Sequence, residues 1–390
     1  MEDTPLKLVY VTPALYMAGG VERVLTLKAN YFAEHFGYDI TIILTEGKGK
    51  PLFYPLSDKV KVINLDLNFE ELWTCSFVKK VWVYLRKQRQ FKRLLTRELM
   101  RIRPDITISL LRREINFIND IGDGSKKIGE LHVNRANYRN LGIRDTNCVK
   151  RLFSDFWMRS LVGHLKRLDA FVVLTKADRD SWVELKNVAV IPNPLSFTPP
   201  PPDSVLQEKR LIAVGRYSYE KGYDLLLQAW AMIQESVPEW RLEIFGDGDS
   251  LPYEKMCDDL RIDRKRCILN GRTPYIIDEY AKSAFAVCSS RFEGFGMVIL
   301  EAMACGLPVV SFDCPWGPRS IISDGEDGVL IADGDIPKLA TAIMQMIEDD
   351  QLRRKMACTA RHNKTQFRIE YIADTWKILF EEVSSHRNNS

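Results

Sequence analysis

The residues with the clearest chemical potential lie in the stretch 291–301. Gly294 and Gly296 permit a tight loop here, which follows a short apolar run and opens a helix predicted over 298–305. A glycine-rich loop that leads into a helix leaves backbone N–H groups free beside the positive end of the helix dipole. The pattern therefore predicts an anion site, and phosphate is the usual anion at such a place.

Two carboxylates, Glu293 and Glu301, flank this predicted anion site. Carboxylates repel phosphate, so we expect them to bind hydroxyl groups elsewhere on the same ligand. A ligand that carries phosphates in its middle and hydroxyls at both ends is a nucleotide sugar. The sequence elsewhere must supply the elements that position such a site.

The size and composition of the chain are those of a two-domain soluble protein. It has 390 residues, of which 46% are hydrophobic and 27% are charged. The net charge of +3 is too small for bulk affinity toward nucleic acid, and no nucleic-acid recognition motif is present. The cysteines form no Cys-x-x-Cys pair, and neither a signal peptide nor a membrane-length apolar run is found. We therefore expect free thiols and a cytoplasmic protein.

The first half of the chain alternates apolar runs with helical patterns. Strands are predicted over 6–11, 40–44, 60–63, 106–110 and 171–174. Strands separated by helices indicate a parallel, doubly wound sheet that binds ligands at the carboxyl ends of its strands. Gly19 and Gly20 stand at such an end. The pair is either a plain strand-to-helix turn or a place where the backbone closely approaches a phosphate or an acceptor.

His132 follows another apolar run, which ends near residue 131. A lone histidine beside such a run is usually structural, but a strand end in this architecture faces the ligand, and this position favours a functional role. The other four histidines keep the structural interpretation, and no pair of histidines has metal-ligand spacing, so no metal is expected.

The segment 77–103 is strongly basic. It contains ten Lys and Arg residues against one acid, Glu98, with aromatic and aliphatic residues between them. Such a segment is either an amphipathic helix that binds an anionic membrane surface or a core helix with a solvated basic face. The two interpretations have equal support from the sequence. A membrane attachment of this kind would be peripheral and sensitive to salt.

The second half begins after a proline-rich spacer at 199–202 and repeats the strand-helix alternation. Arg216 ends its first predicted strand, and Lys221 precedes a helix predicted over 223–233. A guanidinium and an ammonium beside a helix N-terminus suit a diphosphate, whereas the bland interpretation is two surface bases near a turn. The amphipathic region 366–383 is predicted to form a helix that packs back across to the first domain.

These patterns predict four parts of the chain. They are an N-terminal Rossmann-like domain (1–192), a proline-rich linker (193–208), a second Rossmann-like domain (209–365) and a C-terminal crossover helix with its tail (366–390).

The combined motifs resemble the retaining nucleotide-sugar glycosyltransferases of family 4. The motifs are, in chain order, Gly19-Gly20, Gly215-Arg216, Glu220-Lys221-Gly222 and Glu293-x7-Glu301 with Gly294-Phe295-Gly296. They span almost the whole chain in the family's order, so the set is far more specific than any one motif. The resemblance implies the α/β GT-B fold: two doubly wound Rossmann-like domains that face a deep cleft, with a C-terminal helix packed on the first domain. It also implies that the first domain binds the acceptor and the second binds the donor.

The resemblance also implies roles for individual residues. Arg216 and Lys221 would hold the donor diphosphate and offset charge on the leaving group, and Glu301 would bind the ribose. His132 would contact the sugar near the reacting centre, and the segment 271–273 would lie against the base. Donor-binding roles are implied for Gly19, Gly20, Asn193, Gly215, Arg216, Lys221, Gly271, Arg272, Thr273, Glu293, Gly294, Phe295, Gly296, Met297, Val298 and Glu301, and catalytic roles for His132, Arg216, Lys221 and Glu293.

The expected reaction needs no cofactor beyond the nucleotide sugar as co-substrate. Arg216, Lys221 and the helix N-terminus could stabilise the departing diphosphate without a metal ion. We expect no Asp-x-Asp pattern to stand at a strand end and recruit a divalent ion, and we interpret Asp247-Gly248-Asp249 as a turn that precedes no phosphate-binding helix. Same-face attack by the acceptor follows from the family; a covalent intermediate on Glu293 is the alternative.

The predicted function is transfer of a hexose or N-acetylhexosamine, UDP-linked, to a saccharide or lipid-linked saccharide in cell-surface polysaccharide biosynthesis. The protein would be cytoplasmic, with a possible anionic membrane partner for residues 77–103 and no nucleic-acid partner. Two alternatives stay open. One is a nucleotide-sugar epimerase of the same fold, for which the first half offers only Glu114, Glu130 and His132 as acid or base; the other is a non-catalytic sugar-nucleotide sensor.

Overall fold

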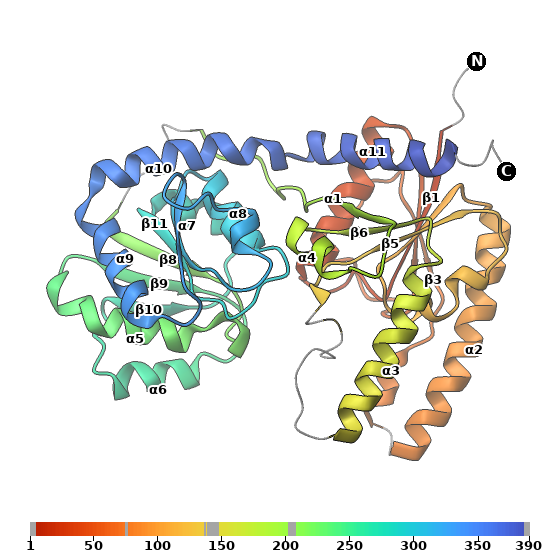
Figure 1. Cartoon of the computed structure of the whole chain (residues 1–390), viewed down its shortest axis with the longest axis horizontal. Helices are drawn as coiled ribbons and strands as arrows, with labels where there is room; N and C mark the ends of the chain where they lie inside the picture. Colours follow the sequence, from red (N-terminus) through yellow and green to blue (C-terminus); the bar gives the residue numbers. More distant parts are fainter. Residues whose placement is uncertain (1–4, 75–76, 136–137, 139–147, 202–207, 386–390) are drawn as a thin grey trace. The chain divides into compact units, whose positions relative to one another are not determined.

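The chain folds into two compact units, each built on one parallel sheet (Figure 1). The computed structural model describes residues 5–74, 77–135, 138, 148–201 and 208–385. Unit 1 comprises Met1–Ser196 together with Ile369–Ser390, and unit 2 comprises Phe197–Arg368. The part of the predicted linker at 202–207 lies outside the described residues.

Unit 1 contains a seven-stranded sheet of order β3-β2-β1-β4-β5-β6-β7, in which all paired strands are parallel. Its elements are β1 (Lys7–Thr12), α1 (Gly20–His35), β2 (Asp39–Leu44), β3 (Lys61–Asn64), α2 (Phe77–Ile102), β4 (Ile106–Ser109), β5 (Lys126–Glu130), α3 (Cys148–Leu165), β6 (Ala170–Val173), α4 (Lys176–Ser181), β7 (Val188–Val190) and α11 (Ile369–Ser385). The apolar runs of the sequence form its strands because parallel strands are covered by helices on both faces.

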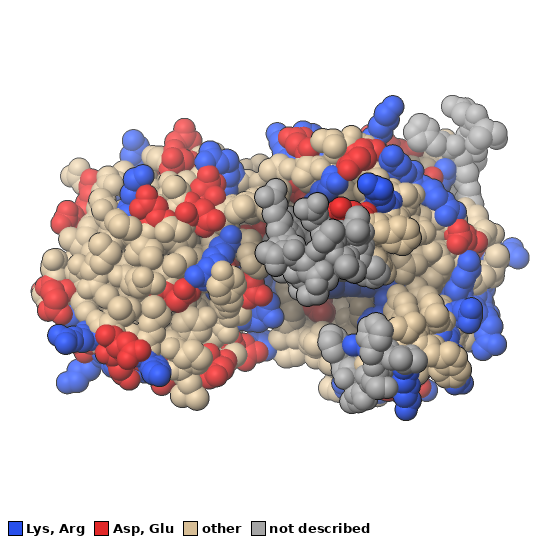
Figure 2. All heavy atoms as spheres, turned by 60° about the horizontal axis from the view of Figure 1, so that its bottom comes forward, with Lys and Arg blue, Asp and Glu red and all other residues tan. Residues whose placement is uncertain are grey.

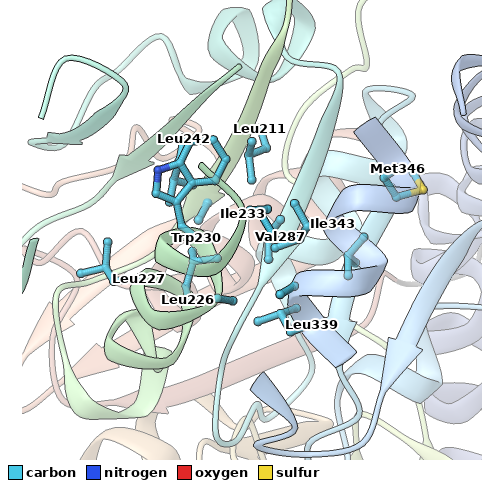
Figure 3. Packing of buried hydrophobic residues seen from close by; sticks show 14 of the residues in the cluster. Leu211, Leu226, Leu227, Trp230, Ile233, Leu242, Val287, Leu339, Ile343 and Met346 are labelled. Atoms are coloured by element: carbon cyan, nitrogen blue, oxygen red, sulfur yellow. The ribbon is translucent and has the colours of Figure 1, made fainter. Parts of the chain in front are cut away.

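Unit 2 contains a six-stranded parallel sheet of order β10-β9-β8-β11-β12-β13. Its elements are β8 (Arg210–Val214), α5 (Tyr223–Ile233), β9 (Arg241–Phe245), α6 (Leu251–Asp259), β10 (Cys267–Asn270), α7 (Ile276–Lys282), β11 (Phe285–Cys288), α8 (Met297–Ala304), β12 (Val309–Phe312), β13 (Gly328–Ile331), α9 (Ile336–Glu348) and α10 (Asp350–Asn363). Figure 3 shows how Trp230 of α5 and Ile343 of α9 pack on Leu211 and Leu242 of the sheet.

The C-terminal helix α11 packs on unit 1, as the sequence predicts. Its buried residues Ile372, Trp376 and Phe380 join the core formed by α1 and the first strands, and Figure 1 shows α11 lying beside α1. The helix begins at Ile369 rather than near Gln366, because a short 3-10 turn at Lys364–Phe367 precedes it.

The basic segment 77–103 is helix α2 followed by one residue, and its two halves differ in burial. Phe91, Leu95 and Leu99 are four residues apart and lie at 0–1% exposure in the core. The N-terminal half instead presents Val81, Trp82 and Leu85 to solvent, at 47%, 63% and 49% exposure. The core interpretation therefore holds for the second half of the helix and does not explain the first.

No helix among the described residues is long and apolar enough to cross a membrane.

Candidate functional site

The central feature of unit 2 is the junction between β8 and β11. These strands are neighbours, and the strand order runs outward from them in opposite directions, β9 and β10 on one side and β12 and β13 on the other. Ligands of doubly wound sheets bind at such a switch point, beyond the carboxyl ends of the strands. Gly215 and Arg216 follow β8 there, and the loop 289–296 follows β11.

The side chains of Lys221 and Glu293 join these two strand ends. Lys221 Nζ lies 2.6 Å from Glu293 Oε1, and Ser290 Oγ donates a hydrogen bond of 2.7 Å to the same oxygen. Burial alone would lower the pKa of Lys221, but the adjacent carboxylate of Glu293 outweighs it and raises that pKa. Lys221 is therefore a cation at neutral pH, and part of its charge is already balanced.

Arg216 is the second cation of the site, and its charge is not balanced in this way. Its side chain is exposed, and it forms no ion pair with any residue that the structure describes. The charge of Arg216, together with the ammonium of Lys221, makes the carboxyl end of β8 suited to bind an anion.

A glycine permits the close approach of the two loops. Gly222 has a φ of +61°, and a Cβ there would lie 2.1 Å from the carbonyl oxygen of Ser289. Ser289 Oγ also donates a 2.9 Å hydrogen bond to the carbonyl oxygen of Lys221. Only glycine fits this position, which places Lys221 against the end of β11.

The helix α8 opens directly from the glycine loop. Gly296 precedes it with a φ of +98°, and the helix begins at Met297, one residue before the predicted start at Val298. The helix N-terminus therefore lies in the same loop as Gly294 and the buried Phe295. Glu301 lies on α8 itself and is 3% exposed.

The loop 316–319, to which we assigned no role from the sequence, packs against the catalytic candidate Glu293. A Cβ on Gly317 would lie 2.5 Å from Glu293 Cβ and 3.0 Å from the carbonyl oxygen of Phe295. The loop thus forms the wall behind Glu293. The Gly317-Pro318 pair after a strand was a turn signal that could have pointed to it.

Arg291 and Asp224 were also missed by the sequence interpretation. The Arg291 guanidinium donates to both oxygens of Asp224, at 2.8 and 2.6 Å, and lies 4.1 Å from the ring centroid of Tyr219. This bidentate pair fastens the loop after β11 to the first turn of α5. The Arg291–Asp224 pair positions the loop that carries Glu293, and its two charges balance each other.

The segment 271–273 lies farther from this junction. It follows β10, which is the edge strand and is separated from β8 by β9. Gly271 and Arg272 are exposed, and Thr273 Oγ1 accepts a 3.1 Å hydrogen bond from the backbone N–H of Tyr275.

The remaining candidates belong to unit 1. Gly19 precedes α1 and Gly20 is its first residue, so both lie beyond β1, next to the switch point between β1 and β4. Asn193 is buried at 6% exposure and comes three residues after β7. His132 follows β5 by two residues, and its Nε2 lies 3.2 Å from Glu130 Oε1.

The Asp247-Gly248-Asp249 pattern stands at a strand end, which corrects our interpretation. It fills the loop between β9 and α6. The Asp247 carboxylate accepts from the N–H of Gly248 at 2.9 Å, and Asp249 accepts from the N–H of Leu251 at 3.0 Å. Both carboxylates thus serve the turn. Within the described part of the chain, no group of three or more His, Cys, Asp or Glu side chains could hold a metal ion.

Comparison with known proteins agrees with this geometry. Residues 199–363 match the family described as "Glycosyl transferases group 1", so unit 2 carries a domain of that kind. An uncharacterized glycosyltransferase of Haemophilus influenzae is 26% identical over 364 residues, which are 92% of this chain and 96% of that protein. The amylovoran biosynthesis glycosyltransferase AmsD of Erwinia amylovora is 34% identical over 217 residues, 53% of this chain and 60% of AmsD.

The share of a relative's length that this chain spans varies from 24% to 96% between the first two curated relatives. Among solved structures, a mutant of S. aureus TarM in complex with fondaparinux, alpha-GlcNAc-glycerol and UDP superposes with a TM-score of 0.76. The two chains are 17% identical, and the match covers 96% of this chain and 99% of TarM. This likeness shows the GT-B fold.

Proposed function

We propose that this protein is a retaining glycosyltransferase that moves a hexose or N-acetylhexosamine from a UDP-linked sugar to a saccharide or lipid-linked saccharide. The observation that carries the proposal is the junction of β8 and β11, where Arg216 lies open beside the Lys221–Glu293 pair and the start of α8. The UDP held by TarM and the polysaccharide named for AmsD support the donor base and the role in cell-surface polysaccharide biosynthesis.

The cations and the carboxylates have different roles in the proposed reaction. Cleavage of the bond between sugar and diphosphate builds negative charge on a phosphate oxygen, which Arg216, Lys221 and the N-terminus of α8 stabilise. Glu293 shares Lys221 with the diphosphate and orients the sugar, while Glu301 binds hydroxyls of the ribose. The acceptor attacks from the face that the diphosphate leaves, which retains the configuration.

The epimerase alternative loses one of its acids in this structure. Glu114 accepts hydrogen bonds from Ser109 Oγ at 2.7 Å and from the N–H of Arg112 at 2.9 Å, and it is 2% exposed. One oxygen of its carboxylate therefore closes the loop after β4, and its burial keeps a substrate from direct contact with it, which disfavours a role as acid or base.

Incubation with UDP- and GDP-sugars tests the proposal. Nucleotide release that depends on a saccharide or lipid-linked acceptor, with a product of the donor's anomeric configuration, is the expected result. Epimerisation would leave the nucleotide attached to an altered sugar, and a sensor would bind without turnover; either result would refute transfer. An inverted product would refute retention alone.

We also propose that the N-terminal half of α2 attaches the protein peripherally to an anionic membrane surface. Trp82 and Leu85 are exposed beside the basic residues Lys79, Lys80 and Arg86. Figure 2 shows Lys and Arg side chains along the outer edge of unit 1. Apolar residues that enter the headgroup region, flanked by cations, are the pattern of an interfacial helix.

Liposome flotation tests the attachment. Binding to vesicles with anionic lipid should be strong at low salt, weaken as salt rises and fall several-fold in Trp82→Ser/Leu85→Ser. Met100→Ser is the matched control, because Met100 is 46% exposed at the other end of the same helix. Equal binding by both variants, or none by the wild type at low salt, would refute the attachment.

A further inference from the structure

Lys28, Glu130 and His132 form a buried row of side chains inside unit 1. Lys28 and Glu130 have side chains only 1% and 2% exposed, and they form an ion pair through Nζ and Oε1. His132 Nε2 lies 3.2 Å from that same oxygen, and its side chain is 7% exposed. One carboxylate oxygen therefore faces both an ammonium and an imidazole.

The ring of His132 faces Glu130 through one of its two nitrogens. Both ring nitrogens are buried without a well-formed hydrogen bond to any described residue. An ionised carboxylate can only accept a hydrogen bond, so the nitrogen that faces Glu130 is favoured in its protonated state. The geometry thus selects Nε2 as the protonated atom and leaves Nδ1 as the ring nitrogen that Glu130 does not hold.

Lys28 keeps Glu130 ionised and in place. Burial acts to raise the pKa of Glu130, but the ammonium of Lys28 and then the imidazole of His132 outweigh it and lower that pKa to about 2. Lys28 is itself held on its far side, where Nζ lies 4.3 Å from the ring centroid of Trp376 and 5.9 Å from that of Tyr10. Lys28 of α1, which Trp376 of α11 contacts, therefore holds the Glu130 carboxylate in place.

We infer that Glu130 is a positioning residue for His132 and that Lys28 acts through Glu130. The pair fixes the orientation of the ring and the proton on Nε2, so that Nδ1 is the ring nitrogen left to accept a hydrogen bond. The role of Nδ1 rests on the proposed function, whereas the state of the ring does not.

Nitrogen-15 NMR of the full chain, labelled at histidine, tests the state of the ring. Comparison with a His132→Gln spectrum identifies the His132 signals among the five histidines. A proton on Nε2 at neutral pH is the expected result. A neutral ring with its proton on Nδ1 alone would overturn the inference. This measurement uses the wild-type protein and needs no variant of the Lys28–Glu130 pair.

The double variant Lys28→Met/Glu130→Met tests the effect on catalysis. It replaces both charges by apolar groups of similar length, and such replacement of a buried ion pair is usually tolerated. Because the ring is no longer held, we expect kcat to fall on the order of 10²-fold with little change in donor KM, and the Nε2 preference to weaken. Lys28→Arg keeps the cation and should preserve the wild-type ring state.

The matched control is Lys127→Met/Asp123→Asn, which removes another buried ion pair whose lysine lies on β5, away from His132. It should leave kcat and the His132 signals unchanged. If Lys28→Met/Glu130→Met folds with wild-type kcat and wild-type His132 signals, the inference is wrong. A wild-type protein that turns over no nucleotide sugar would refute the proposed function instead, and the ring signals would still decide the positioning.

Discussion

At the scale of single residues, the two cations of unit 2 are not equivalent. Lys221 is paired with Glu293 and wedged against the end of β11, whereas Arg216 is exposed and unpaired among the described residues. Removal of Lys221 would break a largely buried ion pair with Glu293 and disturb the fold as well as the proposed chemistry. Arg216 is therefore the cleaner probe of charge on the diphosphate.

Arg216→Ala should lower kcat by about 10²–10³-fold, because the proposed mechanism uses this side chain to stabilise charge on the leaving diphosphate. The free energy of unfolding should change little, because the side chain is exposed. Donor turnover and urea unfolding measure the two effects. Arg354→Ala is the control, since Arg354 is 69% exposed and pairs with Asp350 on its own helix. Unchanged donor hydrolysis and transfer in Arg216→Ala would contradict the assigned role.

The Lys28–Glu130 pair makes the free energy of unfolding of unit 1 decrease as the pH falls into the acid range. The pKa of Glu130 falls from 4.5 to about 2 on folding, so its contribution is complete above pH 4.5 and disappears as the pH falls through about 2. The shift corresponds to about 3 kcal/mol, of which most should be lost between those pH values. Urea unfolding at a series of pH values would show a smaller loss in Lys28→Met/Glu130→Met. An equal loss in both proteins would contradict this account.

At the scale of elements, the loop 316–319 supports the loop that carries Glu293. Gly317→Ala would force its Cβ into Glu293 and the Phe295 carbonyl, so one of the two loops must move. We expect donor KM to rise or kcat to fall by at least tenfold, since small misplacements at a reacting centre are costly. Gly163→Ala on α3 is the control, because a Cβ there meets nothing within 4 Å. Equal activity of both variants would contradict a supporting role.

The sequence predicted the elements of this site better than its contacts. The helix over 223–233 has the predicted bounds, because apolar periodicity and a flanking glycine are local signals. The pairs Lys28–Glu130 and Gly317–Glu293 were not predicted, since Lys28 lies on α1 and Glu130 on β5, and Gly317 and Glu293 lie in different loops. The contrast between the two halves of α2 was also hidden, because burial depends on which residues face the sheet.

At the scale of the whole molecule, unit 1 is built from two separate pieces of chain. Residues 369–390 return to it after the whole of unit 2, and Trp376 of α11 lies 1% exposed in its core. The helix α11 also stands behind Lys28, so it links the C-terminal segment to the ion pair beside His132.

Trp376→Ala should lower the free energy of unfolding of unit 1 by about 3–5 kcal/mol through the cavity that it creates. Hydrogen exchange would report this as faster exchange of the β1 amides, with β8 amides unaffected. Ile378→Ala is the control on the same helix, because Ile378 is 56% exposed. Equal acceleration in β1 and β8 would show that the two units do not unfold separately.

This interrupted construction sets an order of events during translation. When the ribosome has finished residue 196, the nascent first unit still lacks α11. This is the helix that packs on its core and on the buried Lys28. Synthesis up to residue 385 takes roughly 10–40 s more at ordinary elongation rates, and unit 2 can fold in that interval. The nascent chain therefore carries an uncovered apolar face for most of that time, which makes it a natural client for a chaperone.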